Sequence, residues 1–120
     1  MIIALCCDSF MDCQELKNHL ATLCDIPVLA YFNMSEFASA VADRPDTIMI
    51  VARTGTHSAV TASDAAKCNP GGKLVWFCDL DFALLSFRLK SAYFGLLPVD
   101  NEKLKTALSY CGILSTDAIL

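Results

Sequence analysis

The residues of this chain best suited to nucleophilic or redox chemistry are its seven cysteines. Two of them, Cys6 and Cys7, close an apolar run and directly precede Asp8. A reactive thiol needs a depressed pKa, which a neighbouring cation provides. The sequence places no lysine or histidine beside Cys7 or Cys78, and Cys13 stands where a phosphatase-type loop carries arginine. We therefore predict no cysteine-based catalysis and no catalytic residue.

The same cysteines lack the spacing of a metal or disulfide framework. Structural zinc sites use paired Cys-x2-Cys units or matched histidine pairs, and the cluster around Cys7 has neither. Seven is an odd number, and no export signal precedes them, which favours reduced thiols packed as small hydrophobic side chains. His19 and His57 are predicted to be surface or capping residues. We expect no bound metal and no cofactor.

Composition restricts the function classes further. The chain has 120 residues, of which 55% are hydrophobic and 18% charged, and its net charge is −4. Such a chain forms one folded domain with a sizeable core, and its nine basic residues are too few for a nucleic-acid-binding stripe. It lacks a signal peptide and the roughly 20-residue apolar run of a spanning helix. We expect a single cytosolic domain over 1–120, with its core in 1–110 and a tail or linker in 111–120, that contacts neither nucleic acid nor membrane.

Hydrophobic periodicity predicts alternating strands and helices. Strands are marked by short, nearly continuous apolar runs that end in polar residues, as in parallel sheets buried on both faces. Helices are marked by apolar residues at three- and four-residue spacing, with Asn33 and Asp100 as predicted N-caps. The predicted strands are 2–7, 26–32, 47–52, 73–78 and 93–96, and the predicted helices are 12–23, 34–41, 57–67, 82–90 and 101–110.

This alternation predicts the fold. Five strands and five helices joined by short connections imply right-handed crossovers and a parallel sheet with helices on both faces. We predict an α/β, flavodoxin-like, doubly wound fold with strand order 2-1-3-4-5. In such sheets the functional site lies beyond the carboxyl ends of the strands, where the strand order reverses. That rule directs attention to Asp8, Ser9, residues 51–53, Cys78 and Leu97.

At these strand ends the sequence resembles response-regulator receiver domains, in particular those that precede LytTR-type DNA-binding domains. The resemblance covers about residues 1–110. It is carried by MIIALCCDS, which looks like the family's first strand, by PDTIMIVARTG, which looks like its third, and by ALLSFRLKSAYFGLLPVD, which is similar to its fourth-helix to fifth-helix segment. The resemblance implies a signal receiver of a two-component system or phosphorelay that regulates transcription through an output domain.

Most residues that carry the family's phosphoryl chemistry are replaced here. Receivers hold Mg²⁺ with two acids after the first strand, phosphorylate an aspartate ending the third, and use a hydroxyl after the fourth and a Lys-Pro pair after the fifth. The matching residues are Asp8, Ser9, Val51, Cys78 and Leu97, so one of five survives. Valine has no nucleophilic oxygen, and leucine cannot neutralise an acyl phosphate. The resemblance thus implies a degenerate pseudo-receiver that works without phosphorylation, with a cis bond between Leu97 and Pro98.

Two interpretations of Asp8 and of Arg53 remain open from the sequence. Asp8 either keeps a functional role or simply caps the helix that follows it. Arg53 either points into solvent, as surface arginines commonly do, or pairs with Asp8 across the strand ends. Because Mg²⁺ prefers several charged oxygen ligands, Asp8 with the Ser9 hydroxyl is a poor set, and we predict no tight magnesium site.

The resemblance leaves a signalling surface as the working part of the domain. Receivers of this type act through the segment from the fourth to the fifth helix, here about 82–110, and we expect a homodimer that joins any fused or separate effector domain. Phe94 matches an aromatic residue that reports activation in the family, and is otherwise an ordinary core residue. The candidate switch and contact residues are Phe87, Arg88, Lys90, Tyr93, Phe94, Lys103 and Lys105.

A second function class stays open. A doubly wound enzyme or phosphocarrier would use Cys7 or Asp8 at the first strand–helix turn, as carrier domains of sugar-transport systems use a first-strand cysteine. The turn Asp-Ser-Phe-Met-Asp has no glycine-rich phosphate cradle and presents bulk and negative charge to an anion. We favour the non-enzymatic signalling module, and phosphate affinity at this turn would separate the two classes.

Overall fold

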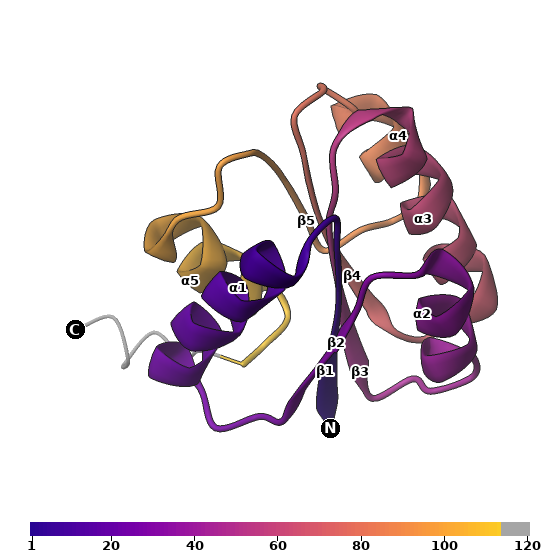
Figure 1. Cartoon of the computed structure of the whole chain (residues 1–120). Coiled ribbons are helices and arrows are strands. Elements are labelled where there is room, and N and C mark those ends of the chain that lie inside the picture. The colour runs from indigo at the N-terminus through magenta and orange to yellow at the C-terminus, as the bar shows by residue number, and fades with distance from the viewer. Residues whose placement is uncertain (114–120) are drawn as a thin grey trace.

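Strands and helices alternate strictly along the chain in the computed structural model, which describes residues 1–113 (Figure 1). The last seven residues of the predicted tail, 114–120, lie outside the described residues. The strands are β1 (Ile2–Cys7), β2 (Val28–Tyr31), β3 (Thr47–Ala52), β4 (Lys73–Cys78) and β5 (Tyr93–Leu96). The helices are α1 (Phe10–Leu23), α2 (Met34–Val41), α3 (Gly55–Cys68), α4 (Ala83–Arg88) and α5 (Asn101–Tyr110).

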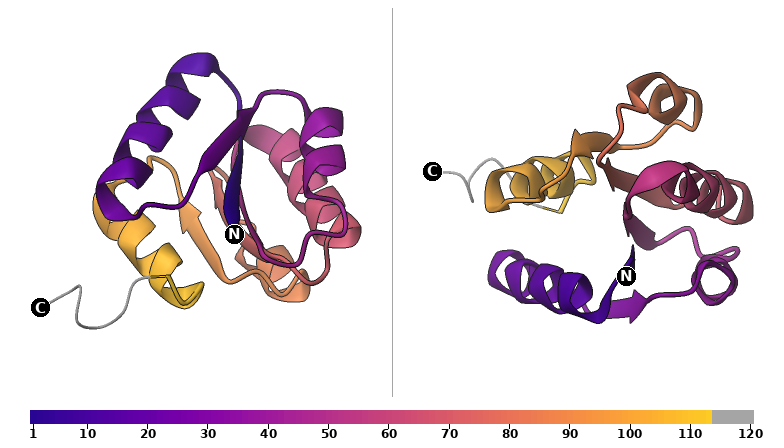
Figure 2. Two further views of the ribbon diagram at one scale, coloured as in Figure 1. Left: turned by 90° about the horizontal axis from the view of Figure 1, so that it is seen from below. Right: turned by 45° about the horizontal axis from the view of Figure 1, so that its top comes forward.

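The sheet confirms the predicted doubly wound, flavodoxin-like architecture. Its five strands are all parallel, in the order β2-β1-β3-β4-β5. Helices α1 and α5 cover one face, and α2, α3 and α4 cover the other (Figure 2). Cys7 pairs with Ala52 in the register, so β1 and β3 finish at the same level. The loops that follow these two strands leave toward opposite faces, which opens a crevice between them.

The sheet divides the core into two clusters. Leu5, Phe77 and Leu104 belong to the cluster beneath α1 and α5, and Phe37 and Trp76 belong to the cluster beneath α2, α3 and α4. All five side chains are buried. Successive residues of a strand face opposite sides of a sheet, so the neighbours Trp76 and Phe77 serve different clusters. Burial on both faces explains the unbroken apolar runs of the central strands.

Side-chain caps fix where several helices begin. Asn33 accepts hydrogen bonds from the Ser35 and Glu36 N–H groups at 2.8 and 3.2 Å, and Asp100 accepts one from the Lys103 N–H at 2.8 Å. Both predicted caps are confirmed. Helix α1 begins at Phe10, two residues before its predicted start, because the Ser9 hydroxyl accepts a hydrogen bond from the backbone N–H of Asp12.

Three other elements differ at their ends from the predictions. Strand β2 spans Val28–Tyr31, shorter than the predicted 26–32. Helix α3 begins two residues early, at Gly55, whose φ of +70° is favourable for glycine. Helix α4 spans Ala83–Arg88 within the predicted 82–90, and Lys90 has a φ of +57° that ends the helical path.

The Leu97–Pro98 bond is cis, as expected. Among the described residues, no helix combines the length and apolar character needed to cross a bilayer.

Candidate functional site

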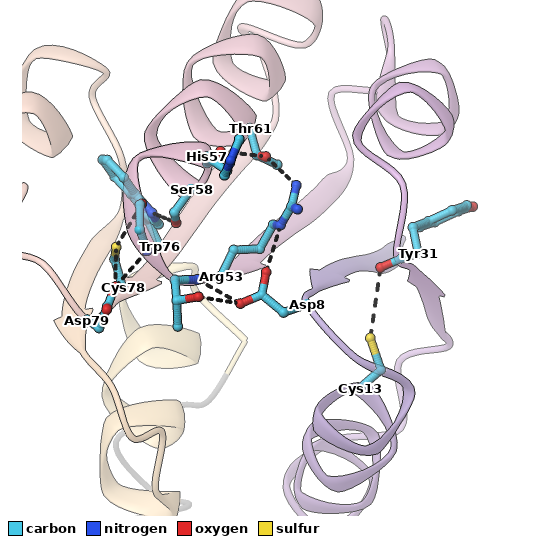
Figure 3. Close-up of polar contacts among 12 residues, drawn as sticks. Asp8, Cys13, Tyr31, Arg53, His57, Ser58, Thr61, Trp76, Cys78 and Asp79 are labelled. Carbon is cyan, nitrogen blue, oxygen red and sulfur yellow. Dashed lines mark hydrogen bonds and ion pairs between the residues drawn. The ribbon is translucent and has the colours of Figure 1, made fainter.

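Asp8 is the centre of a hydrogen-bonded cluster at the carboxyl ends of β1 and β3 (Figure 3). Its Oδ1 accepts a hydrogen bond from Arg53 Nε at 3.0 Å. Its Oδ2 accepts two more, from the backbone N–H of Thr54 at 2.9 Å and from the Thr54 hydroxyl at 2.8 Å. Residues that are 45 and 46 positions apart in sequence thus meet because parallel strands end at one edge.

Arg53 is held on its other side by α3. Its Nη1 donates to the Thr61 hydroxyl at 2.9 Å, and that hydroxyl donates to the His57 carbonyl at 3.0 Å. The Arg53 side chain is 19% exposed and that of Asp8 is 32% exposed. The pairing interpretation of Arg53 is therefore confirmed, and the solvent interpretation is wrong. The capping interpretation of Asp8 is also wrong, because Ser9 caps α1 and the Asp8 carboxylate turns toward β3.

The pKa of Asp8 lies below its ordinary value, and two opposing effects set it. Partial burial alone raises the pKa of this carboxyl. The hydrogen bonds from Thr54 and the charge and hydrogen bond of Arg53 outweigh burial and lower it. Asp8 is therefore ionised at neutral pH, and both of its oxygens already have partners. A carboxylate bound in this way has reduced capacity to hold a metal ion or attack a phosphoryl group.

The structure does not gather the five family positions into one pocket. Val51 and Cys78 are fully buried in the cluster beneath α2, α3 and α4. Leu97 packs against the opposite cluster, beneath α1 and α5. Ser9 is exposed and serves as the cap of α1. Of the five, Asp8 and Leu97 line a common hollow.

That hollow, which we call the acidic hollow, lies between α1 and the segment after β5. Its volume is about 290 Å³. The residue of β3 that faces it is Ala52, and Thr54 follows on the same side. The alternation of side chains along a strand makes Ala52 face away from Val51, but it does not tell which of the two residues faces the hollow. The lining residues are Asp8, Asp12, Glu15, Leu16, His19, Ala52, Thr54, Leu97, Pro98 and Val99.

Cys6 and Cys7, at the end of β1, have little thiolate character. Burial raises the pKa of the Cys6 thiol to about 11, and burial together with Cys13 raises that of Cys7 further. Cys78 is buried, and its Sγ lies 3.7 Å from the Gly55 carbonyl oxygen and 3.5 Å from Asp79 Oδ1. A thiol without thiolate character is a poor nucleophile. All seven cysteines are free thiols.

Asp79, directly after β4, is a second acid at this edge that the sequence reasoning missed. It accepts a hydrogen bond from the Gly55 N–H at 2.8 Å. That bond is the main reason why the pKa of its exposed carboxyl lies below the ordinary value. Asp79 thereby ties the start of α3 to the end of β4. Within residues 1–113, no three His, Cys, Asp or Glu side chains are grouped so that they could hold a metal ion.

The candidate contact residues of the 82–110 segment differ in their exposure. Phe87 is 82% exposed, and Arg88, Lys90 and Lys105 are also exposed. Tyr93 and Phe94 are half-buried, and the Phe94 ring packs edge-on against Trp76 with centroids 5.3 Å apart.

Lys103 has a different setting from the other candidates. Its Nζ donates to the carbonyl oxygens of Leu96 and Pro98, at 2.6 and 2.9 Å. The ammonium group of α5 thus holds the turn after β5, and this link fixes the half-buried Lys103 side chain against that turn.

No known protein-family model matches the chain, and no curated protein matches it at a significant level.

Proposed function

We propose that this chain is a receiver-like signalling domain that acts through protein contacts and is not phosphorylated at the end of its third strand. The observation that carries the proposal is the state of Asp8. It is the one acid retained among the five family positions, and Arg53 and Thr54 occupy both of its oxygens. The parallel sheet in the order 2-1-3-4-5 and the resemblance over about residues 1–110 are consistent with it.

The pair between Asp8 and Arg53 suggests why such a domain needs no metal for its folded state. In a receiver, a divalent cation neutralises the acids after the first strand. Here the guanidinium of Arg53, which is charged at every physiological pH, does so as part of the chain. Val51 adds an apolar, fully buried side chain at the acceptor position. The result is a permanently fixed edge in place of a switchable one.

The exposed apolar side chains of α4 support an output through protein contacts. Leu84 and Phe87 are 67% and 82% exposed, and Leu96 at the end of β5 is 47% exposed. Leu84 and Phe87 are three residues apart and therefore share a face of α4, and exposed apolar side chains gathered on one face are typical of an interaction site. We propose a two-fold symmetric homodimer through this surface, which would bring two copies of an effector domain together.

Phosphorylation is tested by intact mass after incubation with acetyl phosphate and Mg²⁺, with Asp8→Asn treated in parallel. We expect no adduct on either protein. An acid-labile phosphoryl adduct that is lost in Asp8→Asn would make Asp8 an acceptor and contradict the proposal. An adduct that persists in the variant and blocks a thiol would instead support a cysteine phosphocarrier, against which the burial of Cys7 weighs.

The dimer is tested by sedimentation equilibrium with two matched surface variants. Phe87→Ser removes the aromatic ring from α4, and Phe10→Ser removes a ring that is 68% exposed on α1. We expect a concentration-dependent dimer for the wild-type chain and for Phe10→Ser, and a monomer for Phe87→Ser. A wild-type chain that stays monomeric, or two variants that weaken the dimer equally, would remove this surface from the proposal.

A further inference from the structure

A second hollow lies across the ion pair from the acidic hollow, between the loops that follow β2 and β3. Its volume is about 370 Å³, within the range of about 300–1,000 Å³ that is common for small-molecule sites. We call it the donor-lined hollow. Its wall consists of Phe32, Asn33, Met34, Ser35, Arg53, His57 and Val60.

The polar part of this wall offers hydrogen-bond donors and no carboxylate. Arg53 uses two of its five side-chain N–H groups to donate hydrogen bonds to Asp8 and Thr61. Within residues 1–113 its Nη2 makes no hydrogen bond, and this nitrogen carries no dashed line in Figure 3. The Ser35 hydroxyl and the His57 ring likewise have no partner in the described part of the chain.

The position of Arg53 is fixed before any ligand arrives. Asp8 holds Nε and Thr61 holds Nη1, so the plane of the guanidinium cannot rotate freely. A fixed, planar guanidinium recognises carboxylate and phosphate oxygens through paired hydrogen bonds, and little side-chain entropy remains to be lost on binding. The exposed 19% of this side chain is the part that remains available to a ligand.

We propose that the donor-lined hollow binds a small phosphomonoester. Its phosphoryl oxygens would face Arg53, His57 and Ser35, and its organic group would lie on the apolar side chains of Phe32 and Val60. The volume is larger than a bare oxyanion needs, and the apolar rim gives the organic group a surface. This inference rests on the hollow alone and does not depend on the receiver-like function.

The charge balance around the hollow sets the expected strength of binding. Asp8 neutralises much of the positive charge of Arg53 from the far side of the guanidinium. Glu36, in the first turn of α2, is exposed and lies outside the wall. We therefore expect a dissociation constant in the millimolar range. Removal of the Asp8 charge should tighten binding, whereas a variant that only damages the fold would weaken it.

The experiment is a ¹⁵N-HSQC titration with phenyl phosphate at constant ionic strength, with inorganic phosphate and phenol as separate probes. We expect saturable shifts at the amides of Ser35, Arg53 and His57, with tighter binding of phenyl phosphate than of either other probe. Arg53→Gln should weaken binding about tenfold, the usual effect of one charge-assisted hydrogen bond. Asp8→Asn should tighten it severalfold.

Two further variants keep the result interpretable. Lys67→Gln removes one positive charge at the far end of α3 and should leave binding unchanged. His57→Ala removes one donor, leaves the pair between Asp8 and Arg53 intact, and should weaken binding. The proposal is overturned if no probe saturates, if Lys67→Gln weakens binding as much as Arg53→Gln, or if Asp8→Asn binds no more tightly than the wild-type chain. Equal affinity for phenol and phenyl phosphate would overturn it as well.

Discussion

The acidic hollow and the donor-lined hollow lie on the two sides of one ion pair, yet their walls have opposite chemistry. The carboxylates of Asp8, Asp12 and Glu15 line the first, which lies beside α1. Arg53 and His57 line the second, which lies beside α2 and α3. Doubly wound sheets usually have one ligand crevice where the strand order reverses. Here the pair between Asp8 and Arg53 bridges that crevice and divides it in two.

A single long-range contact therefore controls a whole edge of the sheet. The two core clusters lie on opposite faces of the sheet, and the strands separate them. A change in one cluster should therefore leave the other largely in place. We expect the largest effects from changes in these clusters, followed in order by changes at the ion pair, at the helix caps and at the lysines of α5.

Removal of a large aromatic side chain from either core cluster has the largest expected effect on stability. Trp76→Ala and Phe77→Ala each delete a fully buried ring, and each should lower the free energy of unfolding by about 3–5 kcal/mol. The Trp76 indole N–H also donates to the buried Ser58 hydroxyl at 2.7 Å. Trp76→Phe should therefore lower the free energy of unfolding less than Trp76→Ala does. It should still lower it more than the loss of ring volume alone predicts, because the hydrogen bond to Ser58 is also lost. Urea denaturation measures all three, and amide shifts confined to one face of the sheet would support the separation of the two core clusters.

Removal of the charge from Asp8 comes next. Asp8→Asn loses the ion pair but keeps the shape of the side chain, and should cost about 1–2 kcal/mol at neutral pH, because the pair is partly solvated. The folded-state pKa of Asp8 lies below its ordinary value of 3.8. Its contribution is therefore complete above that value and is lost as pH falls through the folded-state pKa.

The stability difference between wild-type chain and Asp8→Asn should accordingly shrink on acidification. Urea titrations at several pH values between neutrality and acid measure it. Arg53→Gln, which removes the other partner, should show the same trend. A difference that stays constant with pH would mean that the carboxylate gains nothing from its partners in the folded state.

Removal of the two helix caps beside the hollows should lower stability by smaller and unequal amounts. The Asn33 side chain accepts hydrogen bonds from two backbone N–H groups at the start of α2. The Ser9 hydroxyl accepts one such bond, at 3.2 Å, at the start of α1. We expect Asn33→Ala to cost about 1–2 kcal/mol and Ser9→Ala about 0.5–1 kcal/mol. Thermal and urea unfolding both report this order. A larger loss for Ser9→Ala would show that the number of capped N–H groups does not govern these two helix starts.

The smallest effects separate two lysines of α5 that the sequence alone treats as equivalent. Lys103 donates to two carbonyl oxygens of the turn after β5, whereas Lys105 forms a solvent-exposed ion pair with Glu102 at 3.8 Å. Lys103→Met should cost about 1 kcal/mol, and Lys105→Met should stay within about 0.5 kcal/mol of the wild-type chain. If both variants unfold alike, the turn does not need its lysine.

The sequence predicts the strands well because their signal is local. The bounds of β1, β3, β4, β5 and α5 agree with the apolar runs and the cap that predicted them. The starts predicted for α1 and α3 each lie two residues after the observed ones. There a hydroxyl cap at Ser9 and the left-handed backbone of Gly55 extend the helix beyond its periodic apolar stripe.

The site was less predictable because its contacts are long-range. Asp8 and Arg53 each had two plausible local settings, and only the level at which β1 and β3 end decides between them. The family resemblance directed attention to Val51, but the pleat of β3 turns Val51 into the core and Ala52 toward Asp8. Sequence periodicity gives the alternation along a strand, but not which of two neighbouring residues faces the crevice.

The place of β1 in the sheet has a consequence for biosynthesis. Of the five strands, β1 leaves the ribosome before the others, yet it lies between β2 and β3 in the sheet, and its residues from Ile3 to Cys7 are fully buried in the finished fold. Its second neighbour ends at Ala52. At about 5–20 residues per second, translation leaves this apolar strand without its second neighbour for several seconds. A nascent chain of this architecture is therefore a natural client for a chaperone at the exit tunnel.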